Sequence, residues 1–180
     1  DSQVFHGQTA KVSARIAGAR SSDHVSLIFS TLDGQFAERM IAMKGAADGP
    51  VEMPTLVEPM LATLGSLPTD EEWGYEFKWD GVRAIAYVDG DDLRLVTRNK
   101  VDVTHAYPEI DVIRTQLAGH RAVLDGEIVA LGRTGVPSFA ALQQRMRTPA
   151  PTPAVVRANP VRFYLFDLLY LDGADLTALP

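Results

Sequence analysis

The sequence predicts an α+β domain made of antiparallel hairpins with a few helices. Three observations lead to this fold class. From residue 57 onward, short apolar segments recur, turn-forming residues separate them, and helical spacing occurs in only two short stretches. Apolar segments joined by tight turns are typical of β-hairpins, and a minority of helices beside them indicates an α+β arrangement.

The first expected strands surround a hairpin. Residues 75–80 are predicted to form a strand that runs into Asp80-Gly81, and residues 82–88 are predicted to form the next one. Residues 89–92 read Asp-Gly-Asp-Asp, which is a strong turn signal. The chain is then expected to return as a third strand over residues 93–97.

Two more strands and a first helix follow along the chain. Residues 123–131 are predicted to form a strand that ends in a glycine-containing turn at residues 132–135. Residues 161–171 are apolar on both faces, which is typical of a strand buried in the middle of a structure. A short amphipathic helix is expected after Pro108, with its apolar face formed by Ile110, Ile113 and Leu117.

A second helix is expected between the last two of these strands. Ser138 has the position and side chain of an N-cap, and the helix is predicted to continue through Met146. Phe139, Leu142 and Met146 would share its apolar face. Residues 148–153 are proline-rich and are expected to form a surface loop.

Composition excludes several classes of site. The chain has 180 residues and no cysteine, which excludes disulfides, zinc-thiolate sites and thiol nucleophiles and suits a reducing cytosol. The first ten residues are polar and show no signal peptide, and the longest apolar run, residues 163–171, is too short to span a membrane. The net charge of -6 argues against a general nucleic-acid coat, although it permits local contact with DNA.

Residues 1–50 are predicted to be distinct from the domain formed by residues 51–180. Residues 45–50 are small and flexible, with glycine and proline, and are typical of a linker. We therefore expect residues 1–50 to be the tail of a preceding module plus this linker.

The densest group of chemically active residues is Glu76-Phe77-Lys78-Trp79-Asp80-Gly81-Val82-Arg83. In a strand, Glu76, Lys78 and Asp80 would share one face while aromatic residues anchor the other. Alternation alone fits a solvated polar face equally well. The order Lys-x-Asp-Gly-x-Arg is rare by chance, however, and this favours a functional site.

Residues 78–83 resemble the signature of the covalent nucleotidyltransferases, which include DNA ligases, RNA ligases and mRNA capping enzymes. The resemblance implies that Lys78 attacks the α-phosphate of a nucleoside triphosphate and keeps the nucleotide as a phosphoramidate. Only a neutral amine is nucleophilic, so Arg83 or a divalent cation would help to lower the lysine pKa. Gly81 would give the sharp turn that lets the backbone approach the nucleotide, with Asp80 as a supporting residue.

Three downstream segments resemble later motifs of the same family, in the same order. By this resemblance Arg98, in Thr97-Arg98-Asn99-Lys100, contacts phosphate. Glu127, in Asp125-Gly126-Glu127, binds the ribose and lies near the metal, with Asp125 as a supporting acid. Phe166 stacks on the purine. Taken alone, Arg98 also fits a basic strand end and Phe166 a core residue, whereas two carboxylates in an apolar strand favour specific partners.

Residues 58–62 and 76–84 together resemble the opening of the ligase module of bacterial ligase D. That resemblance implies ATP and Mg²⁺ or Mn²⁺ as cofactors, DNA ends with a 5′-phosphate and 3′-hydroxyl as substrates, and the Ku protein as a partner in non-homologous end joining. The site would then work in the bacterial nucleoid, with Glu76 near the adenine edge. Residues 1–50 would end a phosphoesterase module. The last motifs and the OB-fold are expected beyond Pro180, so this segment alone is not expected to seal nicks.

Two other functions remain open on the sequence. The Lys-x-Asp-Gly core also serves RNA ligases and capping enzymes, and labelling by GTP in place of ATP would indicate capping. The acidic charge also permits a non-catalytic docking module, for which Lys78 would form no covalent nucleotide.

Overall fold

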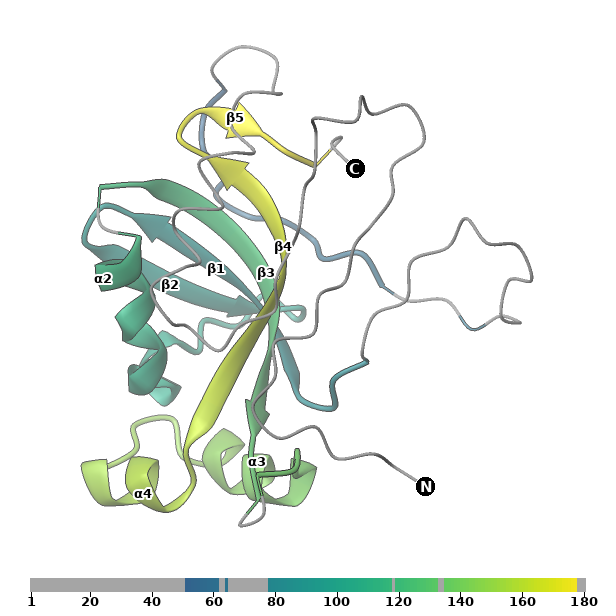
Figure 1. Cartoon of the computed structure of the whole chain (residues 1–180), viewed down its shortest axis with the longest axis vertical. Coiled ribbons are helices and arrows are strands. Elements are labelled where there is room, and N and C mark those ends of the chain that lie inside the picture. The colour runs from purple at the N-terminus through teal and green to yellow at the C-terminus, as the bar shows by residue number, and fades with distance from the viewer. Residues whose placement is uncertain (1–50, 62–63, 65–77, 118, 133–134, 178–180) are drawn as a thin grey trace.

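The computed structural model describes residues 51–61, 64, 78–117, 119–132 and 135–177. Within these residues, strands form one antiparallel sheet in the order β2-β1-β3-β4-β5 (Figure 1). The strands are β1 Val82–Asp89, β2 Asp92–Thr97, β3 Arg121–Ala130, β4 Val161–Leu171 and β5 Ala174–Asp175. The helical elements are η2 Thr104–Ala106, η3 Pro108–Asp111, α2 Val112–Gln116, α3 Phe139–Met146 and α4 Pro153–Ala158. The predicted α+β class is confirmed.

The hairpin of β1 and β2 forms where the turn signal predicts it. Asp89 pairs with Asp92, and Gly90 adopts a φ of 62°, a left-handed conformation that glycine tolerates without steric cost. The strand expected over residues 75–80 is wrong in its described part, because residues 78–80 lie outside any strand. Residues 75–77 fall outside the described residues. Regular pairing begins only at Val82, since the Gly81 N–H is bonded to the Glu127 side chain.

The long strands β3 and β4 form the largest pair in the sheet. Their bounds agree with the predicted strands to within two residues at each end. The pairing register shifts between Val123 and Leu124 and again between Asp125 and Gly126. Such irregularities re-aim side chains at the sheet surface. β4 lies inside the sheet order, but Arg162 and Asp167 are exposed, so the expectation of burial on both faces is only partly met.

The main core covers one face of the sheet. Apolar residues of β1, β3 and β4 pack there against the helical segments, whose contributions are Ile110, Ile113, Leu117 and Leu142. All four of these helical side chains are at most 2% exposed. The predicted amphipathic helix after Pro108 is therefore confirmed, as η3 followed directly by α2. Figure 1 shows α3 and α4 at one end of the sheet and β5 at the other.

Helix α3 begins as predicted but buries a different face. The Ser138 Oγ accepts the Ala141 N–H at 3.3 Å, which is the expected N-cap bond. Leu142 is fully buried, whereas Phe139 is 36% and Met146 49% exposed. The residue that lies in the core beside Leu142 is Arg145, which is 0% exposed. The predicted apolar face was wrong because a buried ion pair replaces one of its members.

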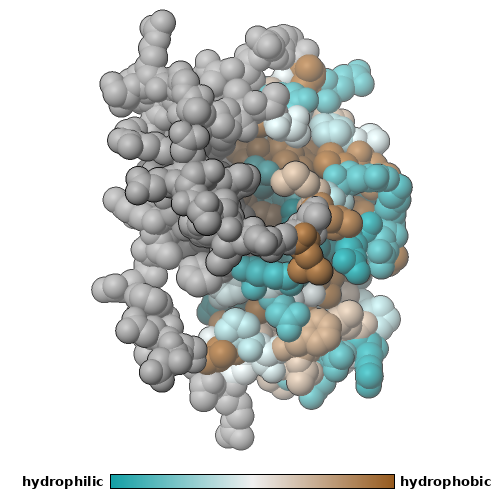
Figure 2. All heavy atoms as spheres, turned by 90° about the vertical axis from the view of Figure 1, so that its right-hand side faces the viewer, coloured by the Kyte–Doolittle hydropathy of each residue, from teal (hydrophilic) through white to brown (hydrophobic). Residues whose placement is uncertain are grey.

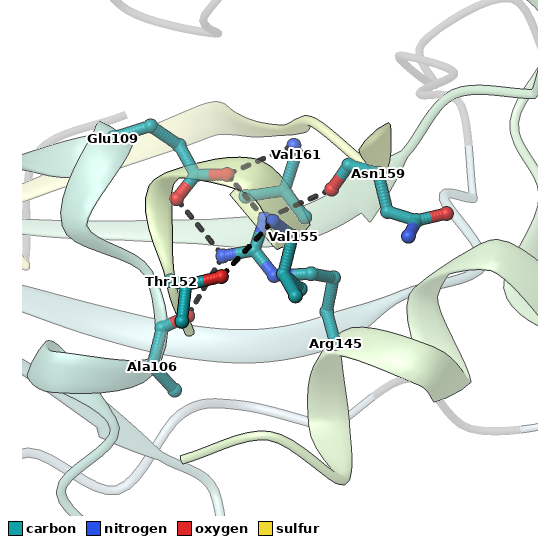
Figure 3. Close-up of polar contacts among 7 residues, drawn as sticks. All are labelled: Ala106, Glu109, Arg145, Thr152, Val155, Asn159 and Val161. Carbon is teal, nitrogen blue, oxygen red and sulfur yellow. Dashed lines mark hydrogen bonds and ion pairs between the residues drawn. The ribbon is translucent and has the colours of Figure 1, made fainter. Parts of the chain in front are cut away.

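Acceptors on other elements bind both terminal nitrogens of Arg145 (Figure 3). Its two terminal nitrogens donate to the Glu109 carboxylate at 2.6 and 3.0 Å. They also donate to the carbonyl oxygens of Ala106 and Asn159, each at 2.8 Å. The same carboxylate accepts the Val161 N–H at 3.1 Å. The Arg145 Nε is buried without a hydrogen-bond partner, but the charge of the guanidinium is paired and both terminal nitrogens are satisfied, which makes its burial tolerable. This network joins α3, η2, η3, the end of α4 and the start of β4.

Helix α4 was not predicted from the sequence. It follows the loop expected over residues 148–153, with Pro153 in its first turn and a cap bond from the Val155 N–H to the Thr152 Oγ1 at 3.4 Å. No residue of α4 is buried, so the apolar periodicity that reveals most helices is absent. None of the helices in the described part of the chain has the length and apolar character needed to cross a membrane.

The second face of the sheet carries a smaller apolar cluster. It includes Ile85, Tyr87, Val123 and Tyr170, and Met53 and Val57 of the preceding segment pack against it. The Tyr87 hydroxyl oxygen accepts the Val57 N–H at 2.7 Å, and the Tyr170 hydroxyl donates to the Val51 carbonyl at 3.2 Å. Residues 51–57 therefore lie along part of this face and leave its other end to polar residues.

Candidate nucleotide-binding site

The polar end of the second face is built on three neighbouring strands. Arg83 on β1 pairs with Glu127 on β3, and Glu127 pairs with Tyr164 on β4. These three residues form one row across the sheet. Side chains two positions apart on a strand share a face, so Asp125 and Phe166 belong to the same surface. The sequence prediction that Asp125 and Glu127 share a face is consistent with this register.

Arg83 and Asp125 form the central ion pair of this surface. The Nε and Nη2 atoms of Arg83 donate to the two carboxylate oxygens of Asp125 at 2.5 and 2.6 Å. The Asp125 side chain is 4% exposed and that of Arg83 is 26% exposed. Burial acts to lower the pKa of Arg83, but the bonds and charge of Asp125 outweigh it and leave the pKa raised. The buried carboxylate therefore has the specific partner that its position requires.

The Arg83 guanidinium also lies over the ring of Phe166, 4.3 Å from the ring centroid. One face of Phe166 is thus occupied by a cation, which is a favourable arrangement for a partly buried guanidinium. The Nη1 side of Arg83 takes no part in the pair with Asp125. Asp125 therefore fixes the orientation of the Arg83 guanidinium, and the Nη1 side keeps N–H donors for an anionic ligand.

Glu127 and Asp167 add negative charge to the surface. Burial raises the pKa of Glu127 from its ordinary 4.5, against the opposing influence of Arg83, the Gly81 N–H and Lys78. Desolvation raises the pKa of Asp167 as well, helped by the charge of Asp125, although Asp167 as a whole residue remains exposed.

Lys78 itself is exposed, in the short segment that leads into β1. The ring of the next residue, Trp79, stacks on Tyr164 with centroids 4.0 Å apart and an interplanar angle of 11°. The Gly81 N–H donates to Glu127 Oε1 at 3.1 Å. A Cβ atom at Gly81 would lie 2.2 Å from the Ile128 carbonyl oxygen. The glycine is required here by close approach of the two strands, and its φ is not positive.

The other predicted site residues are placed less centrally. Arg98 is exposed in the turn after β2; it follows Thr97, which pairs with Ala84, so it lies at the same end of the sheet as Arg83. Asp80 is exposed beside Lys78. Glu76 lies outside the described residues.

Sequence reasoning missed Tyr164 and Asp167 and gave Trp79 only a core role. Tyr164 precedes Phe166 by two positions, so strand alternation alone places the two rings on one face. The stacking of Trp79 on Tyr164 joins residues 85 positions apart in the chain, and no local pattern reveals such a contact.

The site contains carboxylates that could bind a metal ion, but those described do not form a complete set of metal ligands. Among the described residues, no group of three or more histidine, aspartate and glutamate side chains is arranged to hold a metal. Both Asp125 oxygens accept hydrogen bonds from Arg83. Glu127 is therefore the carboxylate of the row that can serve as a metal ligand. This donor set fits a cation such as Mg²⁺ that keeps water and phosphate oxygens as its other ligands.

The chain has extensive similarity to known ligases. Residues 55–180 match the family model of the ATP dependent DNA ligase domain. The multifunctional non-homologous end joining DNA repair protein LigD of Mycobacterium tuberculosis is 37% identical over 180 residues, covering 98% of this chain and 22% of that protein. DNA ligase C of the same organism is 42% identical over 128 residues, covering 69% of this chain and 34% of that protein. The chain thus spans only about a fifth of the LigD proteins that it matches.

Two solved structures are also similar to part of the chain. The crystal structure of the ligase domain of M. tuberculosis LigD has 41% sequence identity and a TM-score of 0.47, covering 56% of this chain and 30% of that one. A mycobacterial DNA ligase D complexed with ATP and MES has 42% identity, the same TM-score and the same coverage. By the family match over residues 55–180, this chain belongs to the ATP-dependent DNA ligase domain family.

Proposed function

We propose that Lys78 of this chain is adenylated by ATP in the first step of DNA end joining. The observation that carries the proposal is that Lys78 is exposed in a segment, inside the family match, that Gly81 and Trp79 attach to the row of Arg83, Glu127 and Tyr164. The neutral Nζ attacks the α-phosphorus of ATP and forms a P–N bond. The bond between the α-phosphorus and the bridging oxygen breaks, pyrophosphate leaves, and the amine loses a proton to solvent.

The surrounding residues supply binding and charge. Arg83, fixed by Asp125, and Arg98 at the same end of the sheet contact phosphate oxygens. Glu127 accepts hydrogen bonds from the ribose hydroxyls while one of its oxygens keeps the Gly81 N–H. Phe166 gives the adenine a face on which to stack, the face opposite to Arg83. Glu76 is proposed to lie at the adenine edge.

A divalent cation, Mg²⁺ or Mn²⁺, is proposed as the cofactor. When bound, it neutralises charge on the phosphates and favours the leaving of pyrophosphate. Glu127 is the residue proposed to hold it, directly or through water. Asp80 and Gly81 shape the segment that presents Lys78.

The later steps and the cellular role follow from the relatives. We propose that the AMP passes to a DNA 5′-phosphate and that a 3′-hydroxyl then displaces it to seal the strand. The names of the LigD relatives support non-homologous end joining, with Ku as the proposed partner, in the bacterial nucleoid. The family match begins at residue 55 while similarity to LigD extends over 98% of the chain, which supports assigning residues 1–50 to a preceding module and linker, proposed to be phosphoesterase.

The proposal is tested by nucleotide labelling. The 180-residue chain and a hybrid, in which residues 55–180 replace the matching segment of the M. tuberculosis LigD ligase domain, are incubated with labelled ATP or GTP and Mg²⁺. We expect label from ATP, no label from GTP, and no label in Lys78→Arg. Label from GTP would indicate capping chemistry in place of ligation. Absence of label in both proteins would contradict the adenylation and favour a docking module.

A further inference from the structure

The stacked rings of Trp79 and Tyr164 are the best-defined contact that the proposed chemistry leaves without a role. Both residues are half-buried, and their planes are nearly parallel at 11°. Trp79 directly follows Lys78 and lies outside any strand, whereas Tyr164 lies within β4. The contact therefore joins the segment that carries the nucleophile to the rigid sheet.

This contact extends across a whole strand. Residues 78–81 lead into β1, and β3 lies between β1 and β4 in the sheet. The Trp79 ring thus meets a residue of β4, two strands away from β1, on the row that Glu127 and Arg83 also occupy. Gly81 is bound to Glu127 in the middle of that row. Residues 78–81 are therefore attached to one row of the sheet at two points, Gly81 and Trp79.

The two attachments differ in what they fix. The bond at Gly81 lies three residues after Lys78 and leaves the intervening backbone torsions undetermined. The ring stack lies on the adjacent residue and restricts the direction in which the Lys78 side chain leaves the backbone. An attacking atom must be held about 3–3.5 Å from its target in the correct orientation, and a displacement of about 1 Å is costly in rate. Stacking next to the nucleophile meets that requirement.

We propose that Trp79 and Tyr164 are positioning residues that orient Lys78 for attack on the nucleotide. The inference rests on the proposed adenylation of Lys78. Neither ring touches the reacting atoms; both act through the backbone of residues 78–80.

If the two rings position Lys78, their loss should slow formation of the Lys78 adduct and leave the affinity for ATP nearly unchanged. At saturating ATP, Tyr164→Leu and Trp79→Leu slow formation of the Lys78 adduct by about tenfold or more, while the Kd for ATP changes by less than about threefold. Tyr164→Phe and Trp79→Tyr keep a stack and retain rates close to those of the unchanged protein. The double variant Trp79→Leu/Tyr164→Leu is no slower than the slower single variant, because each change removes the same contact.

The measurement is single-turnover adduct formation with labelled ATP, together with equilibrium ATP binding, in the hybrid and in the 180-residue chain. Trp79→Leu changes a residue outside the strands and keeps the test valid if Tyr164→Leu does not fold. Adduct formation at the unchanged rate in Trp79→Leu overturns the proposal, as do additive losses in the double variant or equal losses in Tyr164→Phe and Tyr164→Leu. Failure of the adenylation itself is recognised separately, because the unchanged protein then carries no label.

Discussion

Gly81 separates the reactive segment from β1, and the space around it admits no side chain. The Cβ of an alanine would lie 2.2 Å from the Ile128 carbonyl and 2.9 Å from the Glu127 Cγ. Because the nearest atom belongs to the backbone of β3, the strands must separate to relieve the clash. We expect Gly81→Ala to lower the free energy of unfolding by about 1–3 kcal/mol, the usual cost of overpacking, and to abolish adduct formation.

Chemical denaturation of Gly81→Ala beside Gly132→Ala checks this expectation. Gly132 is a matched control, since the nearest atom to its added Cβ would be 3.4 Å away and its φ is not positive. Equal stability losses in the two variants would contradict the close approach at Gly81.

Glu127 gives the site a defined pH dependence. Burial raises its pKa above the ordinary 4.5, so the folded chain binds this proton more tightly than the unfolded chain. The stability contributed by protonated Glu127 is complete below pH 4.5 and is lost as the pH rises through the folded pKa. The unfolding free energy of the unchanged chain minus that of Glu127→Gln should therefore fall with rising pH above 4.5.

Denaturation at a series of pH values, with Glu52→Gln as an exposed control, measures that difference. A difference that grows with pH would mean that the Glu127 carboxylate is stabilised in its charged form, contrary to the burial seen here.

At the scale of elements, Arg145 joins the helices to the sheet. We expect Arg145→Met to lower the free energy of unfolding by about 3–5 kcal/mol, because it leaves Glu109 without its cation in a largely buried place. Arg147→Met, two residues along and exposed, should change the value by less than about 0.5 kcal/mol. Denaturant titration of both variants makes the comparison. If the two losses were similar, the buried pair would have no special part in stability.

The elements that the sequence predicts well are those whose signals are local. The hairpin at Gly90, the Ser138 cap and the apolar spacing of Ile110, Ile113 and Leu117 depend on neighbouring residues alone. The strand expected over residues 75–80 failed in its described part because contacts with β3 and β4 determine that segment. Helix α4 was missed because it buries no residue.

The whole molecule has two unlike faces. Helices and the main apolar core cover one face of the sheet, while the other carries the segment of residues 51–57 and the polar row. Figure 2 shows hydrophilic and hydrophobic residues side by side on the described part of the surface in that view. The second face of the sheet carries both apolar and polar residues, which suits a ligand with both a base and phosphates.

Much of the candidate site could be predicted before the fold was known. The order of Lys78, Arg83, Asp125 and Phe166 along the chain resembles a family, and the register then brings three of them into contact. The fixed pairing of Arg83 with Asp125 could not be predicted, because it depends on the diagonal offset between β1 and β3. The same is true of Tyr164, whose partner lies in another part of the chain.

The central claim is that Lys78 is the nucleophile on this face. Peptide mass spectrometry of the hybrid after incubation with ATP and Mg²⁺ tests it most directly, with Lys78→Arg treated in parallel. We predict one AMP on the peptide that contains Lys78 and none on that peptide in Lys78→Arg. An AMP on any other lysine, or an equal amount on Lys78→Arg, would contradict the account.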